Sequence, residues 1–564
     1  MITQIKTFFA KHEWVIFVLL LLSFLLIRLP AVYSPYHQDE YKWVYYSHPE
    51  IIPPGTVPHP PLTEFIYTTL GPILGDNNFR FIPLFFGVLN LFLMFYLSKI
   101  IFDKKTALIS AFLFIVSFYS LLASLMVDVD GAVMPFFLLL MFIGYYKLKL
   151  VDFRWKEASW QAITLLLFGA VCGFLVKVVF AIPIAVLALD FALEKNTFAD
   201  KRKILKLILY SALGAVCLVL ILILSKFIFP SFNLAYSLKY WEHFANFGSR
   251  GWFQTFIQFV KAILYSSPLL LLPLSFIDKD IFKKTRPILL FLITEVIFYL
   301  FVFDFSTGAL DRYFQFIIIP LCIVSGVVWS GLQAGIFRIK KSHLVIISAI
   351  SIFIFFIQFL PHYVPSLYPK SEWLNRFISL KWNFLYPFSG GSGPLGFYIS
   401  FLFMALSWLV ATGGIFMAFW KSQYKKLILV FLMTIGIIYN GIFIEEYLFG
   451  SINGYAPRLL HSAVEYIKNN PSISKIIVYN DNGGYDIQSI GKYQRRLYTA
   501  PYFSGQLEYL NQNKGYYFVL DVPRLDPNSF YMPYFNSCKS IYRKVDKKIS
   551  ATVYDCRKAP DIKK

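Results

Sequence analysis

The chain has 564 residues, of which 57% are hydrophobic and 15% are charged. Soluble domains carry a larger share of charge, so this composition excludes an ordinary soluble enzyme and indicates a membrane protein with many spans. The formal net charge of +21 does not call for nucleic-acid binding, because the cytoplasmic loops of membrane proteins are rich in lysine and arginine.

Apolar segments long enough to cross a bilayer recur as far as about residue 448. The first follows a basic tail, and Leu29-Pro30-Ala31 does not resemble a small-residue cleavage site, so we expect a retained anchor. We predict a polytopic α-helical membrane protein with about 13 transmembrane helices, at residues 13–30, 81–102, 106–125, 131–150, 159–176, 178–193, 205–229, 257–277, 286–304, 313–333, 343–360, 396–420 and 427–449.

The connectors between these spans differ in charge and length. Basic connectors follow every second span, so the positive-inside rule places them and the N-terminus in the cytoplasm. The loops on the other side are longer and rich in aromatic residues, and long loops on a rigid scaffold often carry function. The basic connectors are 104–105, 147–156, 195–206, 279–286, 338–341 and 421–426, and the long outer loops are 31–80, 230–256 and 361–395.

The first outer loop, residues 31–80, contains several polar motifs. It holds Tyr-His-Gln-Asp-Glu-Tyr at 36–41 and His-Pro-Pro-Leu at 59–62. The amphipathic segment 63–74 suits a helix that lies in the membrane interface.

The chain changes in character at about residue 450, because no later segment is able to span a bilayer. We therefore predict a multispan domain at 1–449 and a small extracytoplasmic α/β domain at 450–564. In the second we expect helices at 458–469 and 505–511 and strands at 475–479, 516–520 and 550–554. Cys538 and Cys556 lie in this domain, and either a disulfide or two unpaired thiols fits the sequence.

Two acidic motifs lie at predicted membrane ends. Asp39 and Glu40 follow the first span, and carboxylates beside a bilayer are costly unless they have a function or a partner. Asp128 and Asp130 lie between two spans with almost no loop. They either contribute to a polar site or cap the following helix.

The other candidate site residues also have competing interpretations. Lys177 lies where two spans meet, and it either pairs with a lipid phosphate or extends its amine to the interface. Arg312-Tyr313 suits a site, an ion pair or an interfacial anchor. Glu295 suits a site, a buried structural acid or a misplaced span. His37 and His59 do not have the spacing of a zinc site, which favours substrate hydrogen bonding or packing.

Nucleotide-powered and redox chemistry have no support in the sequence. It contains no Walker loop, dinucleotide fingerprint, hydrolase elbow or paired CxxC motif.

Taken together and in order, these motifs resemble the GT-C membrane glycosyltransferases. The resemblance is to the branch that contains the dolichyl-phosphate-mannose protein mannosyltransferases and the bacterial aminoarabinose transferase of lipid A. It covers residues 14–200 most strongly and extends through the multispan bundle. The motifs that carry it are Asp39-Glu40, His59-Pro60-Pro61-Leu62, Asn78-Phe79-Arg80, Asp130, Gly173 to Lys177 and Arg312-Tyr313.

The resemblance implies a prokaryotic plasma-membrane enzyme that moves a sugar from a polyprenyl-phosphate donor to a protein, lipid or glycan acceptor at the outer face. It implies that Asp39 is the catalytic base and Glu40 its support, with Asp130 or Asp128 as a second acid. Lys177 and Arg312 are then contacts of the donor phosphate. His59, Arg80 and Tyr313 complete the expected substrate-binding set.

The expected chemistry needs one base and a basic pocket, because the leaving group is already a phosphate. Attack opposite that phosphate inverts the anomeric centre. No cofactor is required, and a divalent metal is an open addition to Lys177 or Arg312. The main alternative is a lipid-linked sugar flippase or transporter, and a further one is a structural or polysaccharide-binding membrane protein.

Overall fold

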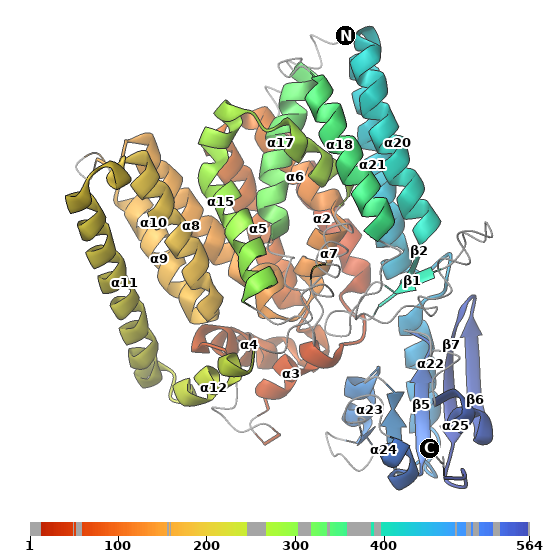
Figure 1. The fold of residues 1–564 in the computed structure, drawn as a ribbon. Coiled ribbons are helices and arrows are strands. Elements are labelled where there is room, and N and C mark those ends of the chain that lie inside the picture. The colour runs from red at the N-terminus through yellow and green to blue at the C-terminus, as the bar shows by residue number, and fades with distance from the viewer. Residues whose placement is uncertain are drawn as a thin grey trace.

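The computed structural model describes residues 13–48, 50–51, 59–154, 157, 159–244, 256, 267–302, 317–334, 339–357, 385–387, 396–479, 482–491, 498–499, 507–522 and 531–561. It consists of a bundle of long apolar helices with a small sheet domain at one end (Figure 1). We call that end of the bundle the domain end and the opposite one the basic end.

The bundle is built from helices whose sequences are apolar almost throughout. Six described helices are long and apolar enough to cross a membrane, and a bent pair makes a seventh if it is one span. The chain is thus an integral membrane protein, while the count of about 13 spans stays a prediction. The bundle helices are α2 (Glu13–Arg28), α5 (Phe81–Ile101), α6 (Lys104–Val116), α7 (Phe118–Leu125), α8 (Met134–Leu150), α9 (Trp160–Val176), α10 (Ala181–Glu194), α11 (Lys201–Ile228), α14 (Pro268–Leu271), α15 (Lys279–Phe301), α17 (Ile318–Ala334), α18 (Lys341–Ile357), α20 (Phe401–Trp420) and α21 (Lys425–Leu448).

Two predicted spans differ from the structure or lie beyond it. The segment 106–125 is not one straight helix, because α6 and α7 meet at Ser117 with a bend of 71°. Ser117 adopts an extended conformation with φ −70° and ψ 126°, which ends the helical backbone although the sequence stays apolar. In the predicted span 257–277, residues 257–266 lie outside the described residues, and the remainder forms the short helix α14 followed by the 3-10 turn η6 (Leu272–Phe276).

Short helices from the loops cover the domain end. α3 (Gln38–Tyr46), α4 (Pro61–Leu74) and the 3-10 turn η2 (Asp76–Asn78) come from the first long loop, and α12 (Leu234–Phe244) follows α11. Figure 1 shows α3, α4 and α12 lying across the ends of the bundle helices. The predicted amphipathic helix at 63–74 is confirmed as α4, which begins with a proline, a residue favoured in the first helical turn.

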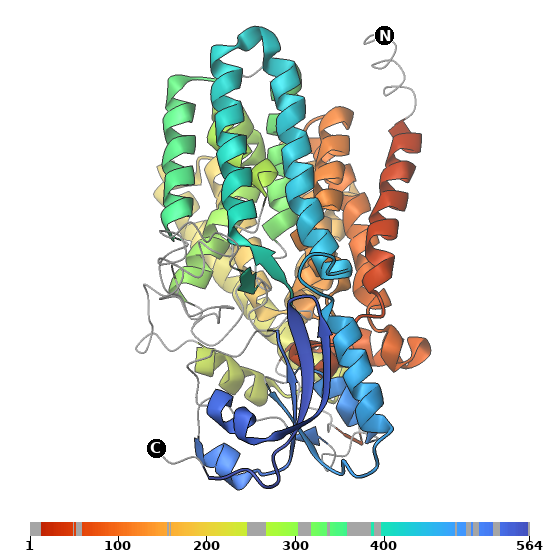
Figure 2. The same ribbon diagram turned by 90° about the vertical axis from the view of Figure 1, so that its right-hand side faces the viewer.

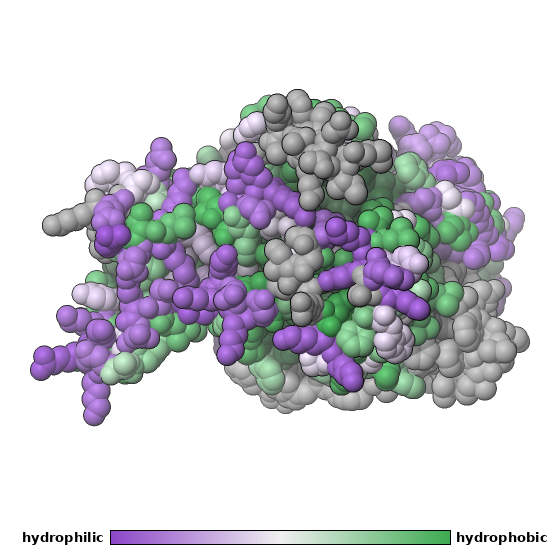
Figure 3. Space-filling model, turned by 90° about the horizontal axis from the view of Figure 1, so that it is seen from above, coloured by the Kyte–Doolittle hydropathy of each residue, from purple (hydrophilic) through white to green (hydrophobic). Residues whose placement is uncertain are grey.

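The basic end is held by a cluster of ion pairs. Asp190 of α10 accepts hydrogen bonds from Tyr145 and Lys149 of α8, at 2.7 and 2.9 Å, and pairs with Arg286 of α15. Glu194 pairs with the same two cations at 3.1 and 2.7 Å. Figure 3 views this end and shows hydrophilic residues gathered over it, as expected for the predicted cytoplasmic connectors.

The C-terminal domain contains a five-stranded mixed sheet with the order β4-β3-β5-β7-β6. β3 is parallel to β4 and β5, whereas β5, β7 and β6 pair antiparallel. Figure 2 shows this sheet below the lower end of α21. The elements are α22 (Ala456–Lys468), β3 (Ile476–Val478), α23 (Gly484–Ile490), β4 (Tyr498–Thr499), α24 (Leu507–Gln512), β5 (Tyr516–Leu520), α25 (Tyr531–Ser537), β6 (Lys539–Asp546) and β7 (Ile549–Asp555), and a separate hairpin joins β1 (Leu385–Pro387) to β2 (Tyr398–Ser400).

The predicted α/β character of this domain is confirmed. α22, α24, β3, β5 and β7 match the predicted elements within a few residues, whereas α23, α25, β4 and β6 were not predicted. Cys538 and Cys556 form a disulfide, which settles the alternative left open by the sequence.

A tight turn connects α21 of the bundle to the C-terminal domain. Glu446, near the end of α21, accepts hydrogen bonds from the backbone N–H groups of Ile452 and Asn453 at 2.6 and 3.2 Å. Gly454 has φ +117°, and a Cβ atom there would lie 2.2 Å from the carbonyl oxygen of Asp546. Only glycine fits this conformation and this approach, so the turn fixes how the sheet domain leaves α21.

Candidate active site

The first acidic motif forms the first turn of α3. His37 is the N-cap, and its backbone N–H donates to Glu40 Oε2 at 3.0 Å. This reciprocal contact and the favourable position of acids at a helix N-terminus explain why the helix starts here. The backbone of Asp39 lies in the same turn, while its side chain is outside the part of the chain that the structure describes.

Glu40 is joined to Arg80, the residue before α5, in a buried bidentate ion pair. The two nitrogen–oxygen distances are 2.5 and 2.9 Å, and both side chains are at most 1% exposed. Arg80 also donates to the carbonyl oxygens of Ser34, Pro35 and Leu125, at 3.1, 2.8 and 2.7 Å. All five guanidinium N–H groups therefore have protein partners, and Arg80 fastens the start of the first loop to α7.

The two acidic motifs meet through the backbone of Val127. The Val127 N–H donates to Glu40 Oε1 at 3.1 Å, and Val127 immediately precedes Asp128. The Glu40 carboxylate therefore accepts from His37 in its own turn and from two residues far away in the chain, Arg80 and Val127. This contact places the α3 turn against the segment 127–130, as a shared site requires.

Asp128 and Asp130 have different environments. Asp128 caps the π-turn η3 (Val129–Val133), because its Oδ1 accepts from the Val129 N–H at 2.7 Å. This geometry fits the capping alternative. Asp130 lies within the turn and pairs with Lys177 Nζ at 2.6 and 2.9 Å.

Lys177 lies in the break between α9 and the 3-10 turn η4 (Val178–Phe180). Its backbone is extended, with φ −156° and ψ 133°, and its side chain is 3% exposed. The amine is buried beside a carboxylate and does not reach an exposed interface. Glu295 of α15 is 1% exposed and interacts electrostatically with both Lys177 and Asp130. Glu295 is therefore a second carboxyl group beside Lys177, after Asp130.

Helix α4 contacts the chain beside both buried ion pairs, the Glu40–Arg80 pair and the Lys177–Asp130 pair. The Tyr67 hydroxyl donates to the Asp128 carbonyl oxygen at 2.9 Å, and Thr63 Oγ1 donates to the Val176 carbonyl oxygen at 3.2 Å. A run of rings extends this support: Trp43 of α3 stacks on Tyr67 at 5.0 Å and on His59 at 5.9 Å. His59 thus packs against the α3–α4 contact.

The C-terminal domain also contacts α3. The Tyr45 hydroxyl donates to Gln488 Oε1 of α23 at 2.7 Å, and both residues are buried. Tyr485 of α23 packs against Tyr36 and Tyr41, with ring centroids 5.0 and 6.3 Å apart. The helix that carries the first acidic motif is consequently held by both domains.

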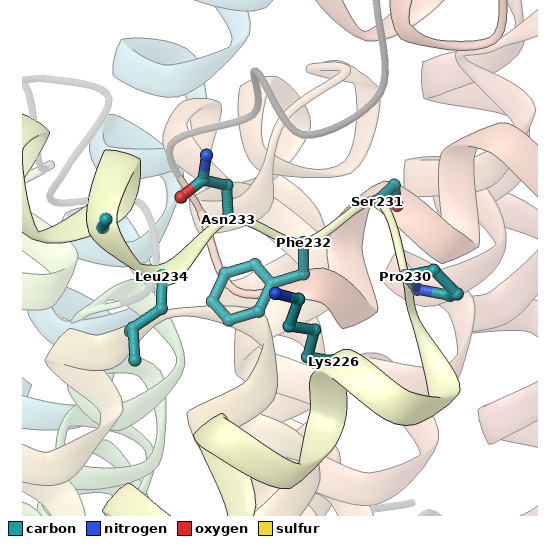
Figure 4. A pocket seen from close by; sticks show the side chains of 7 residues that line it. Lys226, Pro230, Ser231, Phe232, Asn233 and Leu234 are labelled. Carbon is teal, nitrogen blue, oxygen red and sulfur yellow. The ribbon is translucent and has the colours of Figure 1, made fainter.

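A cavity of about 610 Å³ opens beside α4, where α11 leads into α12 (Figure 4). The Lys226 amine lies beside the Phe232 ring in this view. Phe232 belongs to a buried cluster with Leu222 and Phe174, and Phe174 lies three residues before Lys177. Burial raises the pKa of Glu64 on α4, and a hydrogen bond with Ser231 of the cavity wall lowers it. The cavity therefore adjoins α4 and the buried cluster that contains Phe174.

Two predicted site residues lie outside the described part of the chain, and three residues with buried hydrogen bonds near the site were not predicted. Arg312 and Tyr313 lie outside the described residues. Within the described part of the chain, no three His, Cys, Asp or Glu side chains lie close enough to hold a metal ion. The sequence reasoning missed Tyr67, Gln488 and Arg28, the last a fully buried residue that donates to Ser120 and Ser124 at 2.9 and 2.6 Å.

A sequence-family model matches part of the chain. Residues 58–225 match the model of the dolichyl-phosphate-mannose-protein mannosyltransferase family. This region includes α4, Arg80, Asp128, Asp130 and Lys177. No curated protein sequence matches the chain.

Among solved structures, the fold is similar to that of ArnT from Cupriavidus metallidurans bound to undecaprenyl phosphate. The two are 13% identical, with 96% of this chain and 98% of that chain covered and a TM-score of 0.51. The archaeal oligosaccharyltransferase AglB from Archaeoglobus fulgidus, in complex with an inhibitory peptide and a dolichol-phosphate, is 13% identical over 91% of this chain and 70% of that chain, with a TM-score of 0.47. The family match and the ArnT fold confirm the predicted resemblance and the predicted fold class.

Proposed function

We propose that this protein transfers a sugar from a polyprenyl-phosphate-linked donor to an acceptor at the membrane face that carries the C-terminal domain. The observation that carries the proposal is the contact of the two acidic motifs, through the 3.1 Å hydrogen bond from Val127 N–H to Glu40 Oε1. The mannosyltransferase match and the likeness to ArnT bound to undecaprenyl phosphate support the same donor class. The acceptor is a protein, lipid or glycan.

In the proposed reaction Asp39 is the general base. It takes the proton of the acceptor hydroxyl as that oxygen attacks the anomeric carbon of the donor sugar. The bond from the anomeric carbon to the phosphate oxygen breaks, and polyprenyl phosphate leaves with the electron pair. Attack from the face opposite the phosphate inverts the anomeric centre.

Glu40 and Arg80 act in this proposal by positioning the α3 turn. Both side chains are buried, and every guanidinium N–H is already bonded to protein, so rigidity of the turn is what the pair supplies. A base held in one geometry avoids the cost of ordering it during the reaction.

Lys177 is the proposed cation at the donor phosphate, with Asp130 holding its amine. Its two bonds to Asp130 hold the charged amine in one position inside the bundle. A preorganised cation in a buried site stabilises the charge that develops on a leaving phosphate. Arg312 and Tyr313 are proposed contacts of the same group.

The cavity beside Lys226 is the proposed side from which the donor lipid approaches. α11 is apolar, and only 6% of the residues in its apolar 18-residue window are buried, so the helix has a face available to lipid. The Lys226 amine at the end of that helix suits a lipid phosphate at the interface, and the buried cluster that contains Phe232 also contains Phe174, three residues before Lys177. With the basic end in the cytoplasm, this approach is from the outer leaflet.

The direct test uses purified protein in lipid nanodiscs, a radiolabelled polyprenyl-phosphate sugar and a membrane extract as the source of acceptor. We expect transfer by the natural chain and a loss of at least about 100-fold in Asp39→Asn, the typical contribution of a general base. Asp152→Asn is the matched control, because Asp152 is an exposed acid at the basic end that pairs with Lys195 at 2.7 Å. Full transfer by Asp39→Asn rules out the assigned base, and movement of the lipid without transfer supports a flippase. A parallel sample treated with EDTA reports whether a divalent metal takes part.

A further inference from the structure

A second cavity, of about 630 Å³, lies between the C-terminal domain and the first loop. Its volume is in the usual range for small-molecule sites. One wall comes from the end of α2 and the first loop, and the other comes from α22 and α23. The lining residues are Pro30, Tyr33, Ser34, Pro35, Tyr36, Asn77, Phe449, Tyr455, Pro457, Arg458, Leu460, His461, Tyr485 and Asp486.

Tyrosine side chains form part of both the exposed rim and the buried floor of this cavity. Tyr33 is 72% exposed at the rim, whereas Tyr36 and Tyr485 are 5% and 4% exposed at the floor. Their rings meet edge to face at 5.0 Å and are held in place by the contact of the two domains. Aromatic rings with a polar tip offer a flat apolar surface beside hydrogen-bonding groups.

The acid of this cavity, Asp486, lacks a partner for one oxygen. Asp486 lies in the first turn of α23, and its Oδ2 atom is buried with no hydrogen-bond partner among the residues that the structure describes. A buried carboxylate oxygen without a donor is costly. A ligand that brings a donor to this wall, after a small rotation of the carboxyl group, removes that cost.

The cations of the cavity already have acidic neighbours. Arg458 lies 3.8 Å from Asp546, and His461 lies 3.4 Å from Glu465. Both are on the exposed rim. Among the described residues, one oxygen of Asp486 lacks a hydrogen-bond donor, whereas the two cations already have anionic neighbours. This combination disfavours a phosphate or carboxylate ligand.

We propose that this cavity binds a hydroxyl-rich saccharide. A sugar ring places its C–H face on a tyrosine ring and donates hydroxyl protons to acceptors such as Asp486 and the Asn77 carbonyl oxygen. The site is separate from the catalytic turn but adjoins it, because the carbonyl oxygens of Ser34 and Pro35 accept from Arg80 at 3.1 and 2.8 Å. Saccharide binding here goes beyond the proposed transfer and requires no donor lipid.

The test measures binding alone, by saturation-transfer NMR on the full chain in nanodiscs. The probes are the methyl glycosides of mannose, glucose, galactose, N-acetylglucosamine, arabinose and glucuronic acid, together with a polyproline peptide. We expect at least one neutral glycoside to bind. Its apparent Kd should weaken about tenfold in Asp486→Ala, the usual effect of losing one hydrogen bond to a charged group, and less in Asp486→Asn, which keeps an acceptor oxygen.

Three further variants make the result specific. Tyr33→Ala should also weaken binding, because it removes a rim ring that is 72% exposed and whose loss does not disturb the core. Lys468→Ala is the control, since Lys468 is exposed on α22 and does not line the cavity. Asp39→Asn should bind as the natural chain does, which separates this proposal from the transfer reaction.

Three outcomes would overturn the proposal. They are the absence of saturation on all six glycosides, equal affinity in Asp486→Ala, and binding of the polyproline peptide or glucuronide in place of every neutral sugar.

Discussion

Lys177 Nζ bonds both carboxylate oxygens of Asp130, at 2.6 and 2.9 Å, across two separate breaks in the helical bundle. Lys177 lies between α9 and η4, and Asp130 lies in the π-turn η3 before α8. Both side chains are at most 3% exposed. A pair buried this deeply is sensitive to the loss of either partner, because the remaining charge stays in a poorly solvated place.

The first prediction concerns this pair. Lys177→Met should destabilise the protein by about 3–5 kcal/mol, the usual cost of leaving one buried partner alone. The double variant Lys177→Met/Asp130→Asn should recover part of that loss, since neither partner of the pair is then left as an unpaired charge. Thermal unfolding in detergent measures both changes.

Sugar transfer by the double variant separates two roles for Lys177. If Lys177 acts on the donor phosphate, the double variant regains stability without activity. Recovery of both would show that the pair is structural and that the donor phosphate is bound elsewhere.

The second prediction concerns Arg80. Arg80→Lys keeps the charge but has three N–H donors in place of five, so it cannot satisfy Glu40, Ser34, Pro35 and Leu125 together. We expect a loss of several kcal/mol, on the order of 3, and a large fall in transfer. Arg154→Lys is the matched control, because Arg154 is 64% exposed in its pair with Glu157. Equal melting temperatures for the two variants would contradict a positioning role.

Much of the fold could be predicted because it depends on hydropathy along the chain. Apolar runs located α5, α8, α9 and α11, and alternation or apolar clustering located β3, β5 and β7. The missed strand β6 has mostly exposed or partly exposed side chains on both faces, so its sequence lacks the alternation that marks a half-buried strand. The bend at Ser117 has no proline or glycine to signal it.

The candidate site could be predicted only as a set of residue types. The sequence indicated that Asp39, Glu40, Asp130 and Lys177 are unusual at membrane ends. It did not show that Glu40 binds Arg80 or that Lys177 binds Asp130, because those pairs form between residues 40 and 47 positions apart. Tyr67 and Gln488 were missed because tyrosine and glutamine are ordinary in loops, and only the fold gives them partners.

The third prediction concerns the hold of the C-terminal domain on α3. Tyr45→Phe and Gln488→Ala each remove the 2.7 Å hydrogen bond between the domains. Each should cost about 0.5–1.5 kcal/mol and lower kcat more than it changes KM. A double-mutant cycle should show that the two losses do not add. Tyr424→Phe is the control, since Tyr424 is 53% exposed and lies just before α21. Strict additivity would show that the contact does not position α3.

The fourth prediction concerns the packing of α4. A Cβ atom on Gly71 would lie 2.0 Å from the Phe79 ring, and that ring is fully buried. Gly71→Ala should therefore displace α4 and cost about 1–3 kcal/mol, with a loss of transfer because α4 supports the chain beside both buried ion pairs. Gly71→Ala/Phe79→Leu should restore part of each.

Gly214 of α11 offers the matched control for this change. A Cβ atom there would meet nothing within 4 Å among the described residues. Gly214→Ala should be neutral or stabilising by up to about 1 kcal/mol, because alanine is the better helix former. A similar loss of stability at both positions would mean that the effect at Gly71 is not steric.

The fifth prediction concerns pH and Asp486. Burial raises the pKa of the Asp486 carboxyl from 3.8 to about 6, against smaller lowering effects of its own backbone N–H, His461 and Arg80. Because the pKa is higher in the folded chain, the folded state binds the proton more tightly. The stability from this group is therefore full below about pH 4 and is lost as pH rises through about 6. A shift of this size corresponds to ~2–3 kcal/mol.

Asp486→Asn keeps a carboxamide oxygen in place and does not titrate, so it should be more stable than the natural chain at pH 7.5 and lose that advantage at pH 4.5. The difference between the two melting curves cancels the titration of every other group. A saccharide bound at Asp486 should reduce the advantage at pH 7.5, because its hydroxyl supplies the donor that the carboxylate oxygen lacks. A stability difference that does not change between the two pH values would show that the buried carboxyl is not the titrating group.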